Sequence, residues 1–287
     1  MSIYIEDTAL KNKLAELYDP REATKITELA FEYITNMSRV EMARGRYRSM
    51  TELEKEKLVI LTEKLLTHCP IQYAINESWF GGLKIFVDNN VLIPRPETEE
   101  LVELISKDKA IALENSKSFK ILDIGTGSGC ISILLRKKLF RAEITSIDVS
   151  ESALTVAKKN SDTYRANLLL KKIDILDEKQ WETLDVYDVI VSNPPYVMEK
   201  EKEAMSKNVL NFEPSIALFV PDKDPLLFYK KIASFGITHL APNGHIYVEI
   251  NEALGKETSS MFKAAGYNAE IKKDLQGKDR MIKARKL

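Results

Sequence analysis

Apolar residues in the first 75 positions recur every three or four residues, which is the spacing of one face of a helix. Thr51 and Glu54 have the form of a capping box and predict a helix that begins there and runs to Pro70. Two further stripes at helical spacing are Leu10, Leu14 and Leu17, and Ile26, Leu29, Ala30, Tyr33 and Ile34. Residues 1–75 are therefore predicted to form a small all-α N-terminal domain.

The next segment, residues 76–92, changes to β-prone residues. Two such runs in ESWFGGLKIFVDNNVLIP flank the turn-forming sequence Asp88-Asn89-Asn90. This pattern predicts a β-hairpin that links the helical domain to the rest of the chain.

From about residue 93, short β-branched runs alternate with helical stretches, which is typical of βαβ units and a parallel sheet. The last two runs lie only a short loop apart and predict a terminal hairpin, so one strand should be antiparallel. The strand candidates are FKILDIG, AEITSID, NLLLKKID, YDVIVS, GHIYVEI, NAEIKKDL and RMIKARK. We expect residues 93–287 to form an α/β, Rossmann-like domain with a seven-stranded, mostly parallel sheet and a C-terminal antiparallel hairpin.

Composition narrows the class of protein. The chain has 287 residues, 44% of them hydrophobic and 30% charged, as in globular proteins with a core. Its net charge of −1 gives no global positive field, so we expect no direct, stable nucleic-acid binding, although this does not exclude a local basic patch.

No apolar run approaches the roughly 18–20 residues of a membrane span. Glu6 and Asp7 stand where a signal peptide would carry basic charge. The two cysteines and three histidines are scattered in no metal-ligand spacing. We expect a cytoplasmic protein with no membrane segment and no metal.

A glycine loop follows the first strand of the predicted sheet. Residues 123–129 read Asp-Ile-Gly-Thr-Gly-Ser-Gly and lead directly into a helical stretch, where open α/β sheets bind ligands. The dinucleotide pattern is G-x-G-x-x-G, but here the third glycine comes one residue early. Asp123 beside the loop would repel a phosphate and suit an ammonium group, which favours the methionine moiety of S-adenosylmethionine over NAD. The residues predicted to bind this cofactor are Asp123, Gly125, Thr126, Gly127, Ser128 and Gly129.

Two more acids stand at the ends of the following strands. Asp148 comes about 20 residues after the glycines, the usual position for an acid that binds a ribose hydroxyl pair. Asp174 could accept the exocyclic N–H of adenine, with Ile175 against the ring. Together at successive strand ends, these residues predict a cofactor site.

A stiff corner, Asn193-Pro194-Pro195-Tyr196, ends the strand YDVIVS. A planar NH2 is a poor nucleophile because its lone pair is delocalised, and two acceptors, one for each N–H, would orient its nitrogen. The Asn193 side-chain carbonyl and the Pro194 backbone carbonyl can supply them, with Pro195 fixing the turn and Tyr196 offering a flat face. The corner alone leaves three substrates open: adenine N6, cytosine N4 and a glutamine amide.

The chain resembles the HemK/PrmC family of class I methyltransferases, which modify the glutamine of the Gly-Gly-Gln motif in peptide chain release factors. The resemblance covers essentially the whole chain. It is carried by PIQYAINESWFGGLKIFV leading into VLIPRPETEELVE, and by DIGTGSG, SNPPY and NFEPSIALF.

The resemblance implies an S-adenosylmethionine-dependent protein-glutamine N5-methyltransferase that releases S-adenosylhomocysteine. Asn193, Pro194 and Tyr196 would be catalytic, Asn193 would also contact the cofactor, and the N-terminal helices would help to hold the release factor. Residues implied to bind substrate are Arg95, Asn193, Pro194, Pro195, Tyr196 and Glu213. Ile175 stands where the family often has an aromatic residue. The alternatives are a ribosomal-protein glutamine methyltransferase, an adenine-N6 methyltransferase and a non-catalytic binding module.

Overall fold

In the computed structural model, which describes residues 1–114 and 119–287, the chain forms two compact units. The helical unit comprises residues 1–77 and 206–212, and the α/β unit comprises residues 78–205 and 213–287. Across the described residues, no helix has the length and apolar character needed to cross a membrane.

Side chains cap the N-termini of several helices in the helical unit. Asp19 caps α2 through the Arg21 and Glu22 N–H groups, and Thr51 and Glu54 form the predicted capping box of α4. The helix α4 ends at Leu66, four residues before the predicted end at Pro70. The helices are α1 (Ile3–Leu14), α2 (Pro20–Thr35), α3 (Arg39–Gly45), α4 (Glu52–Leu66), α5 (Ile71–Ile75) and α9 (Lys207–Phe212). Their core contains Leu10, Leu14, Ala30, Phe31, Leu61 and Leu65.

A seven-stranded sheet forms the centre of the α/β unit. Its strands are β3 (Lys120–Ile124), β4 (Glu143–Asp148), β5 (Leu169–Lys172), β6 (Tyr187–Ser192), β9 (Leu240–Glu249), β10 (Tyr267–Lys273) and β11 (Asp279–Lys286). They lie in the order β10-β11-β9-β6-β3-β4-β5, and β11 is antiparallel to both of its neighbours. The predicted fold class, a mostly parallel sheet with a C-terminal antiparallel hairpin, is confirmed.

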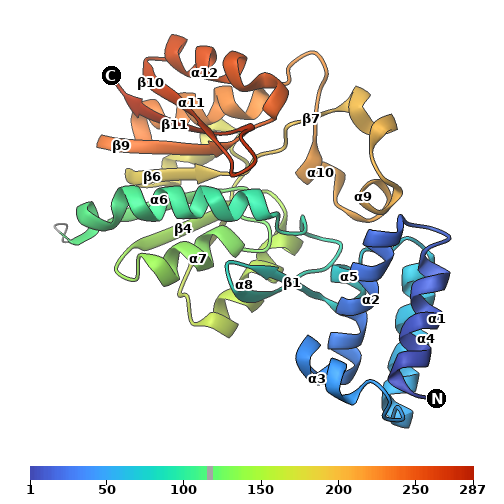
Figure 1. Cartoon of the computed structure of the whole chain (residues 1–287). Helices are drawn as coiled ribbons and strands as arrows, with labels where there is room; N and C mark the ends of the chain where they lie inside the picture. Colours follow the sequence, from blue (N-terminus) through green and yellow to red (C-terminus); the bar gives the residue numbers. More distant parts are fainter. Residues whose placement is uncertain (115–118) are drawn as a thin grey trace. The chain divides into compact units, whose positions relative to one another are not determined.

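Helices cover both faces of this sheet because alternate strand residues point to opposite sides. Leu122, Ile190 and Val248 belong to the core with α11 (Leu227–His239) and α12 (Gly255–Ala264). On the other side the Tyr247 hydroxyl donates to Asp108 of α6 (2.9 Å). There α6 (Pro96–Glu114), α7 (Cys130–Lys138) and α8 (Glu151–Tyr164) lie side by side (Figure 1).

The remaining elements are short. The helix α10 (Ser215–Leu218) precedes β8 (Phe219–Val220), which pairs with β7 (Val197–Met198). Turns of 3-10 helix occur at Glu178–Thr183, Glu199–Ala204 and Glu252–Leu254.

The predicted hairpin exists, but its predicted turn at Asp88-Asn89-Asn90 is wrong. The strands β1 (Glu77–Phe80) and β2 (Leu83–Phe86) are joined by Gly81 and Gly82, whose φ angles are +56° and +76°. Positive φ at both positions suits a two-residue turn that follows the strand twist, and glycine adopts it without steric cost. Asp88 forms a separate local turn, in which its carboxylate accepts the Asn90 N–H (2.9 Å).

The two hairpin glycines differ in their surroundings, which predicts different costs of substitution. A Cβ on Gly81 would overlap the buried Leu134 side chain, whereas a Cβ on Gly82 meets nothing within 4 Å. Gly82→Ala should cost about 1–2 kcal/mol of unfolding free energy for the left-handed backbone. Gly81→Ala should cost about 1–3 kcal/mol more, because the core around Leu134 is overpacked.

Urea unfolding followed by tryptophan fluorescence would measure both variants. Trp79 and Trp181 are the two tryptophans of the chain, and both belong to the α/β unit, so their emission reports on that unit. Equal losses in the two variants would contradict the packing argument.

Candidate functional site

The strand order changes direction beside β3. The strands β4 and β5 continue on one side of β3, while β6 and β9 continue on the other, which creates the crevice where open α/β sheets bind ligands. Ile124 pairs with Ser192, so the segments that begin at Gly125 and Asn193 leave the sheet next to each other. A cavity of about 220 Å³ lies at this edge, lined entirely by residues of the α/β unit.

The glycine loop forms one wall of the cavity. Gly125, Gly127 and Gly129 all have positive φ (+71°, +53° and +79°). A Cβ on Gly125 or Gly127 would meet nothing within 4 Å, and both residues line the cavity. Gly129 instead packs closely against Ala157 of α8. The loop therefore presents bare backbone to the cavity and seats its last glycine against a helix.

Asp123 lies beneath this loop and is fully buried. Its Oδ2 accepts hydrogen bonds from Thr126 Oγ1 (2.8 Å) and Ser132 Oγ (2.7 Å), while its Oδ1 has no hydrogen-bond partner among the described residues. Burial raises the pKa of Asp123 to about 6, against the lowering effect of the two hydroxyl groups. Asp123 thus braces the loop from below, and its expected contact with an ammonium group stays a prediction.

Asp148 also supports the loop. Its Oδ2 accepts the Gly127 N–H (2.9 Å) and its Oδ1 accepts the Ser150 N–H (2.9 Å). Burial raises the pKa of the Asp148 carboxyl, and these two N–H groups oppose the rise. Asp148 lines the cavity, so one carboxylate faces the space while holding the loop that borders it.

Asp174 and Ile175 lie just beyond the end of β5 and also line the cavity. Asp174 Oδ1 accepts the Leu176 N–H (2.9 Å), and its own N–H donates to Gln180 Oε1 (3.0 Å). The Ile175 carbonyl accepts the indole N–H of the buried Trp181 (3.0 Å). This short turn is therefore held rigidly at the cavity wall.

The Asn193-Pro194-Pro195 corner forms the wall next to the glycine loop. Asn193 Nδ2 donates to Thr98 Oγ1 (3.0 Å) on the first turn of α6. Thr98 Oγ1 donates in turn to Glu249 Oε2 (2.6 Å) at the end of β9. Because the Nδ2 atom is engaged by Thr98, the Asn193 carbonyl oxygen points in a different direction.

Tyr196 reaches the same carboxylate from the other side, since its hydroxyl donates to Glu249 Oε1 (3.1 Å). Burial and the charge of Glu249 raise the pKa of Tyr196 well above its usual value, so the phenol stays protonated and donates. The ring is not among the described residues that line the cavity. The predicted flat-face contact of Tyr196 with substrate stays a prediction.

Arg95 and Glu213 join two segments of the chain beside the cavity. Arg95 Nη2 donates to Glu213 Oε1 (2.7 Å), and the Ile93 N–H donates to Glu213 Oε2 (3.3 Å). Glu213 is buried, whereas Arg95 and the neighbouring Pro214 line the cavity.

Comparison with known proteins gives the family. A family model described as "Methyltransferase small domain" matches residues 104–212. The release factor glutamine methyltransferase of Flavobacterium psychrophilum is 41% identical over 282 residues, covering 96% of each chain. The protein of the same name from Bacteroides thetaiotaomicron is 39% identical, covering 96% of this chain and 97% of its own.

The chain belongs to the release factor glutamine methyltransferase family. A structural relative, the "delta-N METTL16 MTase domain", has a TM-score of 0.51 and covers 71% of this chain and 89% of its own. Its sequence is 18% identical, so it supports the methyltransferase fold alone.

The structure brings most of the predicted site residues of this family member together. Those that line the cavity are Arg95, Gly125, Thr126, Gly127, Ser128, Asp148, Asp174, Ile175, Asn193, Pro194 and Pro195. Asp123, Gly129, Tyr196 and Glu213 are not among the described lining residues. Within the described part of the chain, no group of three His, Cys, Asp or Glu side chains could hold a metal ion.

Sequence reasoning missed Thr98, Glu249 and Phe228. Thr98 and Phe228 line the cavity, and Glu249 is the buried acceptor behind Thr98. Glu249 is the second-to-last residue of the predicted strand GHIYVEI, so a charged residue near the end of a buried strand is the available signal. Thr98 sits among charged residues in PRPETEE and carries no comparable signal.

The buried Asp123 predicts a measurable pH effect on stability. Its pKa rises from 3.8 to about 6 on folding, so the folded state binds more protons between these values. Stability from this group is complete below pH 3.8 and is lost as pH rises through 6, by about 3 kcal/mol. Asp123→Asn should remove this loss, so its unfolding free energy relative to wild type should rise between pH 4 and 7.5.

Denaturant unfolding across this pH range tests the effect, and Asp274→Asn is a control whose pH dependence should lie below this range. The Lys278 N–H and Arg280 outweigh the effect of burial at Asp274 and lower its pKa. Stability from that group is present above its ordinary pKa of 3.8 and is lost only below it, so the difference between Asp274→Asn and wild type should stay nearly constant from pH 4 to 7.5. A constant difference between Asp123→Asn and wild type would contradict the assignment.

Proposed function

We propose that this protein transfers a methyl group from S-adenosylmethionine to the side-chain amide nitrogen of the glutamine in the Gly-Gly-Gln motif of peptide chain release factors. The family assignment supports the reaction class. The observation that carries the proposal is the orientation of Asn193, whose Nδ2 is bound to Thr98 beside the glycine loop. That arrangement leaves the Asn193 carbonyl oxygen as an acceptor for a substrate NH2 group.

The cavity suits S-adenosylmethionine in several respects. The bare backbone of Gly125 and Gly127 leaves the room that a Cβ would fill. Asp148 and Asp174 are acceptors for ribose hydroxyl and adenine amino groups, and Ile175 offers an apolar surface. Asp123, with its unpaired Oδ1 below the loop, would add negative charge that suits the ammonium group of a bound methionine moiety. The bound cofactor would supply an electrophilic methyl group on a sulfonium and leave as the thioether S-adenosylhomocysteine.

The protein contributes position rather than a strong base. Asn193 Oδ1 and the Pro194 carbonyl would each accept one N–H of the glutamine amide, which aims the nitrogen lone pair toward the cofactor. The nitrogen gives up one of its two protons to solvent as the new N–C bond forms. Pro195 fixes the corner, and Arg95 and Glu213 hold together two segments beside the cavity. We assign docking of the release factor to the helical unit, and we expect the enzyme to act in the cytoplasm.

The first test is methyl transfer from labelled S-adenosylmethionine to a purified release factor, with mass spectrometry of peptides locating the label. We expect label on the Gly-Gly-Gln glutamine. Asn193→Ala should lower the rate on the order of 10²–10³-fold with little change in cofactor affinity, because a positioned hydrogen bond is lost.

The controls decide the substrate. A release factor with that glutamine replaced should take no label. Label on duplex DNA or on a ribosomal protein instead would refute the release-factor assignment. Near-full activity of Asn193→Ala would remove this residue from the mechanism.

A pair of glycine variants tests the cofactor site separately. Gly125 and Gly266 both have positive φ (+71° and +88°) and open space around a Cβ, but only Gly125 is among the described cavity-lining residues. Each change to Ala should cost about 1–2 kcal/mol of stability. Gly125→Ala alone should weaken S-adenosylmethionine binding in calorimetry. Unchanged affinity in Gly125→Ala would place the cofactor elsewhere.

A further inference from the structure

Four side chains form one hydrogen-bonded chain that begins at the wall of the cavity: Asn193, Thr98, Glu249 and Tyr196, which we call the amide relay. We propose that Thr98 and Glu249 are positioning residues that fix which end of the Asn193 amide faces the substrate. This inference rests on the proposed function, because it matters only if the reacting group is an NH2 that needs an acceptor.

The direction of each hydrogen bond follows from the chemistry of the groups. An ionised carboxylate only accepts, so the single hydroxyl hydrogen of Thr98 is committed to Glu249 Oε2 (2.6 Å). Thr98 Oγ1 can then only accept from Asn193, which selects Nδ2 as the atom facing it (3.0 Å). The Asn193 carbonyl oxygen is thereby turned away from Thr98. The Glu249 carboxylate, two hydrogen bonds away, thus sets the orientation of the Asn193 amide.

Glu249 is held in place by partners on several elements. It is 1% exposed, and the Tyr196 hydroxyl donates to its Oε1 (3.1 Å). The Tyr229 hydroxyl donates to its backbone carbonyl (3.1 Å), which ties the strand end to α11. Strand pairing of Ser192 with Val248 sets Asn193 and Glu249 at the same level of the sheet.

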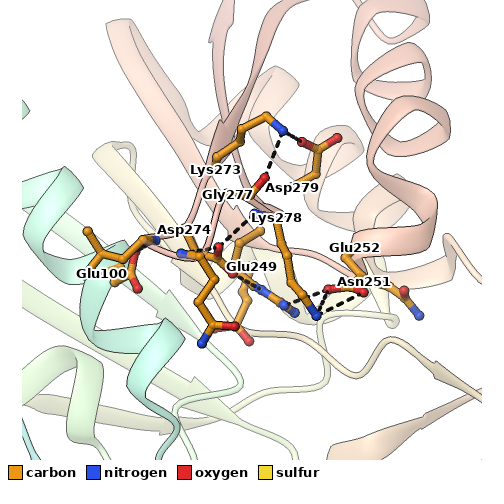
Figure 2. Close-up of polar contacts among 12 residues, drawn as sticks. Glu100, Glu249, Asn251, Glu252, Lys273, Asp274, Gly277, Lys278 and Asp279 are labelled. Carbon is orange, nitrogen blue, oxygen red and sulfur yellow. Dashed lines mark hydrogen bonds and ion pairs between the residues drawn. The ribbon is translucent and has the colours of Figure 1, made fainter.

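Arg280 and Glu97 contribute to the electrostatic environment of Glu249. Burial raises the pKa of Glu249; hydrogen bonds from Thr98 and Tyr196 and the charge of Arg280 oppose the rise, whereas Glu97 adds to it. Arg280 is anchored by Asp274 Oδ2 (3.2 Å) and Glu252 Oε2 (3.1 Å). Figure 2 shows Glu249 beside the turn that contains Asp274, Gly277 and Lys278. Glu252 lies to the right of Glu249 in this view. The β10–β11 turn therefore keeps a positive charge near the relay.

Thr98 variants separate the hydroxyl from the volume of the side chain. Thr98→Val keeps the shape but neither donates nor accepts, so kcat should fall on the order of 10²-fold while S-adenosylmethionine affinity stays nearly unchanged. Thr98→Ser keeps the hydroxyl and should restore most of the activity. Thr258→Val, at a buried threonine whose hydroxyl donates to the nearby Leu254 carbonyl (2.7 Å), is the matched control and should keep wild-type kcat.

Glu249→Gln tests the charge. Its one acceptor oxygen must serve two hydroxyl donors, so kcat should fall by about 10-fold or more. Wild-type kcat should decline at acidic pH as Glu249 is protonated, and the variant should lack this decline. Asp108→Asn removes another carboxylate that accepts a tyrosine hydroxyl, from Tyr247 (2.9 Å), and should leave kcat and its pH profile as in wild type.

A readout without substrate separates this inference from the proposed function. In 1H–15N spectra of the free enzyme, the Asn193 side-chain NH2 signals should shift in Thr98→Val. In Thr98→Ser they should keep their wild-type chemical shifts. Unmoved signals, or full kcat in both Thr98→Val and Glu249→Gln, would overturn the relay. If the signals shift but wild type methylates no release factor, the relay stands and the proposed substrate fails.

Discussion

The parallel pairing of β3 with β6 joins strands that are separated in the sequence by β4, β5 and their helices. Because Ile124 and Ser192 are partners, the glycine loop and the Asn193 corner emerge next to each other. Neither segment could make a site alone: the loop offers bare backbone and the corner offers polar acceptors. Their adjacency follows from backbone hydrogen bonds and right-handed crossovers, so the sheet fixes the geometry before any ligand binds.

The strand β9 pairs with β6 on the side away from β3 and adds a buried acid next to the Asn193 corner. Its last residue, Glu249, is nearly inaccessible to solvent and satisfies two hydroxyl donors. A buried carboxylate is costly to desolvate, and its partners compensate only when they are well placed. A group of this kind specifies one arrangement of its neighbours, because any other would leave a charge without partners.

The sequence predicted the sheet and most of the cavity wall for identifiable reasons. Strand periodicity located β3 to β6, and glycines and acids at strand ends marked the loop, Asp148 and Asp174. The prediction of the hairpin turn is wrong because Asp88-Asn89-Asn90 has strong turn propensity, whereas Gly81-Gly82 lies inside one of the β-prone runs. Thr98 could not be found from sequence, since its partners Asn193 and Glu249 are 95 and 151 positions away.

Asn160 of α8 connects two parts of the α/β unit that are far apart in sequence. Its side chain bonds the Phe86 N–H (2.8 Å), the Phe86 carbonyl (2.9 Å) and the Ser128 carbonyl of the glycine loop (2.9 Å). One buried amide is therefore shared between the hairpin and the loop. A ligand that orders the loop must therefore also disfavour local opening of the hairpin. By thermodynamic reciprocity, opening of the hairpin must lower the affinity of the loop for that ligand. The rate of amide hydrogen exchange at Phe86 would then report on ligand binding in the cavity.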